Sequence, residues 1–330
     1  MPTLCVIPGD GIGQEVIPAA LEVLRAVLPD LQTIHADAGW DCFQRTGSSV
    51  PVETLQAVRD CGAALFGAVS SPARKVPGYR STILTMRQEL DLYANLRPVR
   101  SLPVISPRPD VDMILFRENT EDLYAGREHM ENDDTAVAER VITRRASRRL
   151  AERALDLSQQ LGRRKMTIVH KANILPLTDG LFRDTVREAA RQSAEAGFEM
   201  QIDELLVDVA ALKIASQPQD FDVIITTNLF GDILSDEASH WIGGLGFAPS
   251  LNWGDQVAVA EPVHGSAPDI AGRGLANPIA AILSAALLLR CVWMLPAEAN
   301  AMEQAVEKCL LSTPTSAGTQ EILKSVLSGL

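Results

Sequence analysis

Short apolar runs alternate with longer amphipathic ones along this chain of 330 residues, and that alternation constrains the fold most strongly. Runs of this kind predict buried strands at residues 4–7, 63–68, 113–116, 166–169 and 223–226. Between the first two, residues 15–28 place Val16, Ala20, Leu24 and Val27 on one helical face. Strands separated by helices predict an α/β protein with crossover helices, and the length allows two domains.

Composition excludes several classes of protein. Apolar residues make up 46% and charged residues 22%, which is ordinary for a soluble globular protein. The net charge of −12 argues against a general affinity for nucleic acid or anionic membrane. The longest apolar segment, Ile279–Leu289, is about half the length that a membrane span needs. We expect it to be a core helix that Asn277 caps, with Pro278 in its first turn.

The cysteines and the amino terminus predict a cytoplasmic protein. Residues 1–4 carry no basic region leading into a long apolar one, so no secretory signal is expected. The cysteines lie in or beside apolar stretches and form no C-x-x-C pair, which favours buried free thiols in a reducing compartment. They are Cys5, Cys42, Cys61, Cys291 and Cys309.

Two aspartates follow the last of the predicted strands. The run Phe221–Asn228 predicts a buried strand, and the apolar spacing after it predicts a helix with Asp232 and Asp236 on one face. Two such carboxylates repel each other unless a cation lies between them, and hard oxygen ligands suit Mg²⁺ or Mn²⁺. A solvated acidic helix end is the alternative. Because open α/β sheets bind ligands at the carboxyl ends of their strands, the pattern favours the metal site.

Other polar side chains are candidates for substrate chemistry. Arg87, Arg97 and Arg117 would clamp a carboxylate if they converged, although each alone is more often structural. Lys171 directly follows a predicted strand, and a lysine at a buried strand end near a divalent cation is a candidate general base. Tyr124 is either a phenolic acid or a core aromatic residue.

Two segments that contain glycine bear on nucleotide binding. Residues 9–13 lie between a strand and a helix, but Gln14 breaks the G-x-G-x-x-G spacing. A tight turn therefore explains these glycines better than a standard Rossmann site does. The loop at 261–272 is rich in turn residues and could bring backbone N–H groups and an acidic side chain to a nucleotide. Its His264, taken alone, is more often structural.

The segment 135–164 is rich in arginine. Glu139 and Glu152 are interleaved with the arginines, and the segment contains no aromatic residue. The pattern favours a solvated or subunit-facing helix over a patch that binds nucleic acid.

Taken together, these segments resemble the β-decarboxylating dehydrogenases, the family of isocitrate, 3-isopropylmalate, homoisocitrate and tartrate dehydrogenases. The resemblance runs from Ile7–Gly13 to the helix at 277–290, with several motifs in family order. Ser71–Gly78 and Leu90–Asn95 are most similar to the homoisocitrate branch, which serves lysine biosynthesis.

The resemblance implies a two-domain α/β fold of the isocitrate/isopropylmalate dehydrogenase type, not a standard Rossmann fold, with a cleft between the domains. The cofactor-binding domain would be discontinuous and formed by residues 1–97 plus 247–330. Residues 98–246 would form the domain for metal binding and dimerisation.

The resemblance also implies a homodimer with shared active sites, or a tetramer of such dimers. Asp208 matches the family's third metal aspartate and would join Asp232 and Asp236 of the other subunit, and Lys171 would face the same neighbouring site. Lys171 would take the hydroxyl proton of a 2-hydroxy acid as hydride leaves, and Tyr124 would help to protonate the enolate carbon. Substrate contacts are further implied for Ser71, Arg87, Arg97, Arg117 and Asn173.

The implied hydride acceptor is NAD. A carboxylate at Asp269 can accept hydrogen bonds from both ribose hydroxyls of the adenosine but repels a 2′-phosphate, which favours NAD over NADP. The implied cofactor contacts are Ile12, Val69, Ser70, Ser71, Glu261, His264, Gly265, Ser266, Ala267, Pro268, Asp269, Ile270 and Asn277.

Substrate identity depends on the residues that would meet the third substituent. Leu84 and Ile83 would form an apolar wall for an isopropyl group, whereas Arg80 offers a charge to a distal carboxylate. Ser81 could donate a hydrogen bond to the shorter acid of isocitrate. We expect homoisocitrate, with isocitrate as the next alternative and 3-isopropylmalate or tartrate after it. A non-catalytic regulatory subunit and a nucleotide-binding module of another fold are remote alternatives.

One residue departs from the family pattern. Asp122 stands where the family usually has glycine. If this position requires a positive φ, we expect aspartate to be tolerated at modest cost.

Overall fold

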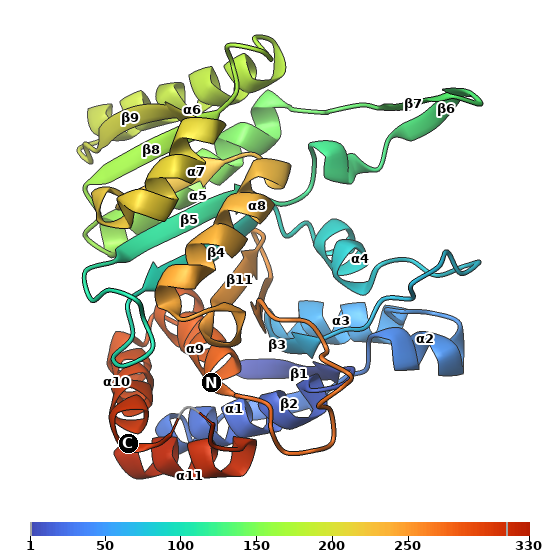
Figure 1. Cartoon of the computed structure of the whole chain (residues 1–330), viewed down its shortest axis with the longest axis vertical. Coiled ribbons are helices and arrows are strands. Elements are labelled where there is room, and N and C mark those ends of the chain that lie inside the picture. The colour runs from blue at the N-terminus through green and yellow to red at the C-terminus, as the bar shows by residue number, and fades with distance from the viewer. Residues whose placement is uncertain (1, 315) are drawn as a thin grey trace. The chain divides into compact units, whose positions relative to one another are not determined.

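The computed structural model describes residues 2–314 and 316–330 (Figure 1). The chain divides into two compact units. Unit 1 comprises Met1–Leu92, Ser101–Pro109 and Ile242–Leu330, and unit 2 comprises Tyr93–Arg100 and Asp110–Trp241. Relative to the expected domains, residues 93–97 belong to unit 2, whereas 101–109 and 242–246 belong to unit 1.

The sheet of unit 1 is mainly parallel. β1 pairs in parallel with β2 and β3, and β3 pairs in parallel with β12. β11 is antiparallel to β12. In spatial order the strands are β2 (Gln32–His35), β1 (Thr3–Gly9), β3 (Ala63–Ala68), β12 (Ala258–Pro262) and β11 (Pro249–Trp253). Every residue of β3 is buried, which explains why this strand shows no alternation of polar and apolar residues.

Helices cover both faces of this sheet (Figure 1). Ile7 and Phe66 pack with Val58 and Met86, which belong to two helices on one face. Val6, the residue before Ile7 in β1, points to the opposite face of the sheet and is buried as well. The helices are α1 (Gly13–Val27), α2 (Trp40–Thr46), α3 (Val52–Cys61), α4 (Thr82–Glu89), η4 (Leu245–Phe247), α9 (Ile279–Leu287), the π-helical turn η5 (Leu288–Val292), α10 (Pro296–Ser312) and α11 (Thr319–Gly329).

Local sequence signals predicted four elements of unit 1. β1 and β3 contain the strands expected at 4–7 and 63–68, and α1 corresponds to the helix expected at 15–28. The Asn277 side chain accepts a hydrogen bond from the Ile279 N–H at 2.9 Å, so the predicted cap of the late core helix is confirmed.

The sheet of unit 2 brings three polar strand ends together. β5, β10 and β8 run parallel, so their carboxyl ends lie at one edge, and β4 is antiparallel to β5. These strands include the expected runs at 113–116, 223–226 and 166–169. In spatial order they are β4 (Ala94–Arg100), β5 (Asp112–Glu118), β10 (Val223–Thr226), β8 (Lys165–His170) and β9 (Gln201–Leu206).

The helices of unit 2 include α5 and α6, which pack together, and α7 and α8, which do the same. Figure 1 shows β6 (Glu128–Asn132) and β7 (Thr135–Ala138) as a separate two-stranded extension. The segment 135–164 was predicted to be a helix, but its first residues form β7, and the helix begins only at Arg144. The helices are η1 (Leu123–Ala125), α5 (Arg144–Gln160), α6 (Thr178–Glu195), α7 (Val207–Ser216), η2 (Pro218–Asp220), α8 (Asn228–Ala238) and η3 (Ser239–Ile242).

The five cysteines all lie within the described residues and are free thiols. Cys61 is only partly buried, unlike the other four. No helix in the described part of the chain is long and apolar enough to cross a membrane.

Candidate functional site

The two aspartates predicted to bind metal lie one turn apart on α8. The predicted helix is present, and it begins at Asn228, which is the last residue of the run that was predicted to be a strand. The Arg117 guanidinium pairs with Asp232, and Arg97 Nη1 lies 2.8 Å from Asp236 Oδ1. The arginines are buried while the Asp232 and Asp236 side chains are 35% and 54% exposed. The positive charges thus lie beneath the carboxylates and offset their repulsion, and the exposed oxygens suit a hard divalent cation.

Both arginines are oriented by neutral acceptors. Asn228 Oδ1 accepts hydrogen bonds from Arg117 Nε at 3.0 Å and from Nη2 at 2.7 Å. Arg97 donates to Asn95 Oδ1 at 2.9 Å and to Ser235 Oγ at 2.6 Å. Each planar guanidinium is therefore held in one orientation toward α8.

Tyr124 joins this group. Its O–H donates to Asp232 Oδ2, and the Arg117 guanidinium carbon lies 5.0 Å from the centre of its ring. Burial is the main cause that raises the pKa of Tyr124 above its ordinary value, and the hydrogen bond to Asp232 adds to it. The phenol consequently keeps its proton at neutral pH, as a proton donor must.

Lys171 and Asp208 form a second group in unit 2. Lys171 Nζ lies 2.5 Å from Asp208 Oδ1, and this ion pair lowers the pKa of Asp208. Lys171 lies in the turn after β8 and is partly exposed, rather than at a buried strand end as expected. Asn173 is exposed in the same turn.

A single chain does not assemble the three-aspartate site. Within residues 2–314 and 316–330, no three Asp, Glu, His or Cys side chains lie close enough together to hold a metal ion. Asp232 and Asp236 therefore form one pair, and Asp208 belongs to a different group with Lys171.

The third predicted arginine belongs to unit 1. Arg87 of α4 is buried, and its Nη2 lies 3.5 Å from Glu261 Oε1. The same carboxylate oxygen accepts a hydrogen bond from Asn252 Nδ2 at 2.7 Å. Of the three predicted arginines, only Arg97 and Arg117 share one unit.

Loops that follow β1, β3 and β12 lie against each other in unit 1. The Ile12 N–H donates to the Ser266 carbonyl at 2.9 Å, and the Ser70 and Ser266 hydroxyls are 2.8 Å apart. A Cβ on Gly11 would lie 2.2 Å from the Ser266 carbonyl oxygen, and its φ is +56°. The glycines at 9–13 thus serve a tight turn and a close backbone approach, as predicted.

The buried carboxylate of Asp10 fastens these loops and was not singled out from the sequence. It accepts hydrogen bonds from the backbone N–H groups of Trp40 at 2.7 Å, Asp41 at 3.0 Å and Ser70 at 2.8 Å. Its partners are up to 60 positions away in the sequence. A polar residue within a glycine turn was the only signal that could have indicated it.

The loop at 264–272 offers groups that fit a nucleotide. His264 Nδ1 lies 3.0 Å from the Gly265 carbonyl, so Nδ1 donates and Nε2 is an acceptor. Burial lowers the pKa of His264, and its buried Nε2 has no hydrogen-bond partner among the described residues. The carboxylate of Asp269 is exposed, and Glu15 holds the loop by accepting a hydrogen bond from the Gly272 N–H at 2.6 Å.

The remaining residues predicted to contact NAD belong to the same loops or border them. Val69, Ser70 and Ser71 follow β3, and Asn277 precedes α9. Glu261 lies within β12 and is paired with Arg87. Gly265, Ala267, Pro268 and Ile270 belong to the loop after β12, where Ala267 has a φ of +38°.

The residues predicted to choose the substrate lie on and before α4. Arg80 Nη2 donates to Gln88 Oε1 at 3.3 Å. Gln88 lies one turn after Leu84 on the same face of α4. Ile83 packs against the hydrophobic cluster beneath the helix. The expected apolar wall of Leu84 and Ile83 stays a prediction.

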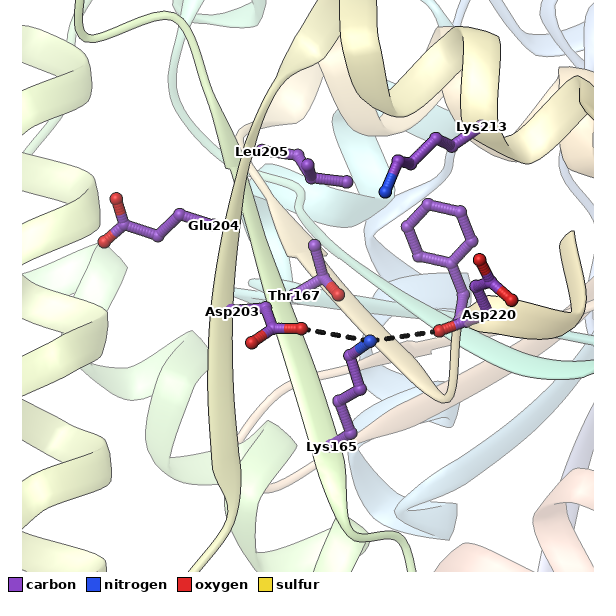
Figure 2. Close-up of a pocket in the computed structure, with 8 residues that line it drawn as sticks. Lys165, Thr167, Asp203, Glu204, Leu205, Lys213 and Asp220 are labelled. Atoms are coloured by element: carbon purple, nitrogen blue, oxygen red, sulfur yellow. Dashed lines mark hydrogen bonds and ion pairs between the residues drawn. The ribbon is translucent and has the colours of Figure 1, made fainter. Parts of the chain in front are cut away.

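A pocket of about 160 Å³ in unit 2 contains none of the predicted site residues. Figure 2 shows it between β8, β9 and the end of α7, with Lys165 Nζ held 3.0 Å from Asp203 and 3.2 Å from the Asp220 carbonyl. Lys165 thus has its partners within the pocket, and Glu204 pairs with Arg187 outside it. We assign it no part in the chemistry.

Comparisons with known proteins find similarity along most of the chain. Residues 3–326 match the family described as isocitrate/isopropylmalate dehydrogenase. An isocitrate/homoisocitrate dehydrogenase from Thermus thermophilus is 52% identical over 87% of this chain and 84% of its own length. A 3-isopropylmalate dehydrogenase from Methanothermobacter thermautotrophicus is 50% identical over 96% of this chain and 93% of its own. The crystal structure of isocitrate dehydrogenase from Methylococcus capsulatus has a TM-score of 0.92 and 38% identity, covering 100% of this chain and 99% of that one.

Proposed function

Because the chain belongs to the isocitrate/isopropylmalate dehydrogenase family, whose members are decarboxylating hydroxy-acid dehydrogenases, we propose that it converts homoisocitrate to 2-oxoadipate. NAD would accept the hydride, and Mg²⁺ or Mn²⁺ would be required. The reaction would serve lysine biosynthesis through aminoadipate in the cytoplasm.

The position of Arg80 is the observation that supports homoisocitrate as the substrate. Its guanidinium extends along the face of α4 that carries Leu84, where it can pair with the distal carboxylate that distinguishes homoisocitrate from 3-isopropylmalate. The apolar side chain of Leu84 favours 3-isopropylmalate as the second candidate. Ser81, at the start of the same helix, favours isocitrate as the third.

The metal would be held by Asp232 and Asp236 together with Asp208 of the partner subunit. These carboxylates are exposed hard donors, which Mg²⁺ and Mn²⁺ prefer. The bound metal would place positive charge at the substrate's 2-oxygen and at the adjacent carboxylate.

The protein's own groups would move the protons. Lys171 would accept the hydroxyl proton while the C2 hydrogen leaves as hydride, and the C3 carboxylate would then depart as CO₂. The Tyr124 O–H would return one proton to C3, so the proton gained at carbon balances the proton lost from oxygen. Arg87, Arg97 and Arg117 would bind the carboxylates of the substrate, and Ser71 and Asn173 would add hydrogen bonds.

The loops of unit 1 would hold NAD. Asp269 would accept hydrogen bonds from the adenosine ribose, and Asn277 would contact the adenine. The buried acceptor His264 Nε2 would receive a hydrogen bond from the cofactor, which supplies the partner that this atom lacks among the described residues.

Exposed apolar side chains support a homodimer with shared sites. They surround the Lys171–Asp208 pair on α7, on α8 and in the turn after β8. A second copy that covered this face would bury them and would carry Lys171 and Asp208 to its neighbour's metal pair. A tetramer could form from two such dimers. The residues are Ile174, Leu177, Val209, Leu212 and Ile233.

The test is a comparison of steady-state rates. Homoisocitrate, isocitrate, 3-isopropylmalate and tartrate are each supplied with NAD and Mn²⁺, and NADH is followed. We expect the highest kcat/KM with homoisocitrate. Faster turnover of 3-isopropylmalate would overturn this choice, and no NADH from any of the acids would favour the non-catalytic subunit.

A further inference from the structure

Three charged residues form a buried cluster in unit 2, and the proposed chemistry uses none of them. The side chains of Asp122 and Asp179 are fully buried, and that of Arg140 is nearly so. Arg140 Nε lies 2.6 Å from Asp122 Oδ1, and its Nη1 lies 2.5 Å from Asp179 Oδ1. Its Nη2 donates to Thr227 Oγ1 at 2.7 Å. The guanidinium therefore spans two carboxylates that belong to different elements.

Asp122 connects this cluster to the proposed acid. It lies two residues before Tyr124, and its Oδ1 accepts a hydrogen bond from the Leu123 N–H at 2.9 Å. Its Oδ2 accepts one from the Leu229 N–H at 3.0 Å, in the first turn of α8. One carboxylate thus fixes both the turn that carries Tyr124 and the helix that carries Asp232, the acceptor of the Tyr124 hydroxyl.

Asp179 connects the cluster to the proposed base. Its Oδ2 accepts a hydrogen bond from the Lys171 backbone N–H at 2.5 Å. The Lys171 side chain extends from this anchored backbone to Asp208. Arg140 therefore links the Tyr124 turn on one side to the backbone of Lys171 on the other.

The cluster is costly for the fold. Buried charges gain little stability compared with apolar side chains of the same shape, because desolvation offsets their attraction. Asp122 also has a φ of +71° and a ψ of −145°, outside the left-handed helical region that aspartate tolerates. The expectation of a modest backbone cost is therefore wrong, since glycine alone adopts this conformation readily. A carboxylate that this chain places here despite the strain indicates a function for the carboxylate itself.

We propose that Arg140 is a positioning residue that holds Tyr124 and Lys171 of one chain in register through Asp122 and Asp179. The proposal rests on the shared active sites proposed above. Tyr124 serves one active site of the dimer and Lys171 serves the other. A defect in this cluster therefore damages both sites, although it lies in one subunit.

Hybrid dimers test this directly. In Arg140→Lys the positive charge remains, but one ammonium cannot reproduce the fork that spans both carboxylates. We expect the homodimer to keep its KM for NAD and to lose about tenfold or more in kcat, because small displacements of reacting groups have large effects on rate. In a hybrid of one wild-type and one Arg140→Lys subunit, one site receives Tyr124 from the variant subunit and the other site receives Lys171 from it. Its activity should fall well below half of wild type.

Two reference hybrids calibrate this measurement. A hybrid with one Lys171→Met subunit should keep half of the wild-type activity, because one site is intact. A hybrid with Arg144→Lys should keep all of it, since Arg144 forms only a surface pair with Glu188. Wild-type kcat in the Arg140→Lys homodimer, or half activity in its hybrid, would overturn the proposal. Shared sites are tested separately by a hybrid of one Lys171→Met and one Tyr124→Phe subunit. It should keep half of the wild-type activity, because one shared site then receives both intact residues, and near-complete loss of activity would instead reject the shared sites.

A second variant keeps the test valid if Arg140→Lys does not fold. Asp122→Gly removes the carboxylate at a position whose backbone suits glycine, so relief of strain offsets part of the lost bonding. It should give the same loss of kcat and the same hybrid result. A folded Asp122→Gly enzyme with wild-type kcat would also overturn the proposal.

Discussion

At the scale of single residues, the Tyr124 hydroxyl donates a hydrogen bond to Asp232, one of the proposed metal ligands. In Tyr124→Phe the aromatic ring remains while the proton donor is lost. We expect kcat to fall by about 10²-fold with little change in KM, because general acid catalysis acts in the transition state. Steady-state kinetics with homoisocitrate measures this. Tyr93→Phe, at a buried tyrosine whose hydroxyl meets Arg153, is the control and should keep its kcat.

Cofactor choice is also decided by single residues. In the double variant Asp269→Lys and Ile270→Tyr, the repulsion of a 2′-phosphate is replaced by attraction. We expect the ratio of kcat/KM for NAD to that for NADP to decrease by an order of magnitude or more. Kinetics with both cofactors measures the ratio. An undiminished preference for NAD would contradict the assignment of this loop.

At the scale of elements, the start of α5 is held by the carboxyl group of Glu121, which is sensitive to pH. Glu121 is buried, and it accepts hydrogen bonds from the N–H and hydroxyl of Thr143, the N-cap of this helix. Burial raises the pKa of Glu121 to about 7, from 4.5. The folded state thus favours the protonated form, and this contribution to stability is complete below pH 4.5 and is lost as the pH rises to 7.

The variant Glu121→Gln checks this dependence, because the amide imitates the protonated acid. We expect the free energy of unfolding of the wild type to fall more steeply between pH 5 and 7 than that of the variant, by on the order of 1–3 kcal/mol. Denaturant unfolding at several pH values measures the difference. Glu188→Gln, at a surface pair on α6, should retain the wild-type slope. Parallel curves for Glu121→Gln and wild type would contradict the assignment.

The exposed face of α4 should set substrate preference. In Arg80→Ala the charge proposed to meet the distal carboxylate is lost while Leu84 remains. We expect kcat/KM for homoisocitrate to fall by about 10–100-fold and that for 3-isopropylmalate to change little. Rates with both acids measure this. Equal losses for the two acids would mean that Arg80 does not distinguish them.

At the scale of the whole molecule, enzyme activity should depend on the association of two subunits into a dimer. Leu212 on α7 is 68% exposed and lies in the apolar group near Asp208. We expect Leu212→Glu to be folded, monomeric and nearly inactive, because a charge in an apolar interface opposes association. Size-exclusion chromatography with light scattering, together with kinetics, checks this. Leu311→Glu, at a residue 69% exposed on α10, should remain dimeric and active. A monomer of Leu212→Glu with full activity would refute shared sites.

The sequence by itself determined the α/β class, the positions of five buried strands, the cap at Asn277 and the aspartate pair on α8. These features depend on local periodicity and on residues a few positions apart, so the pattern of residues along the chain is enough to predict them. Only the tertiary structure decided which partners the charged side chains have. Asp10 with Ser70, Arg117 with Asp232, and the cluster around Arg140 join residues 18 to 115 positions apart. Such partners depend on the path of the chain, and spacing along the sequence does not specify that path.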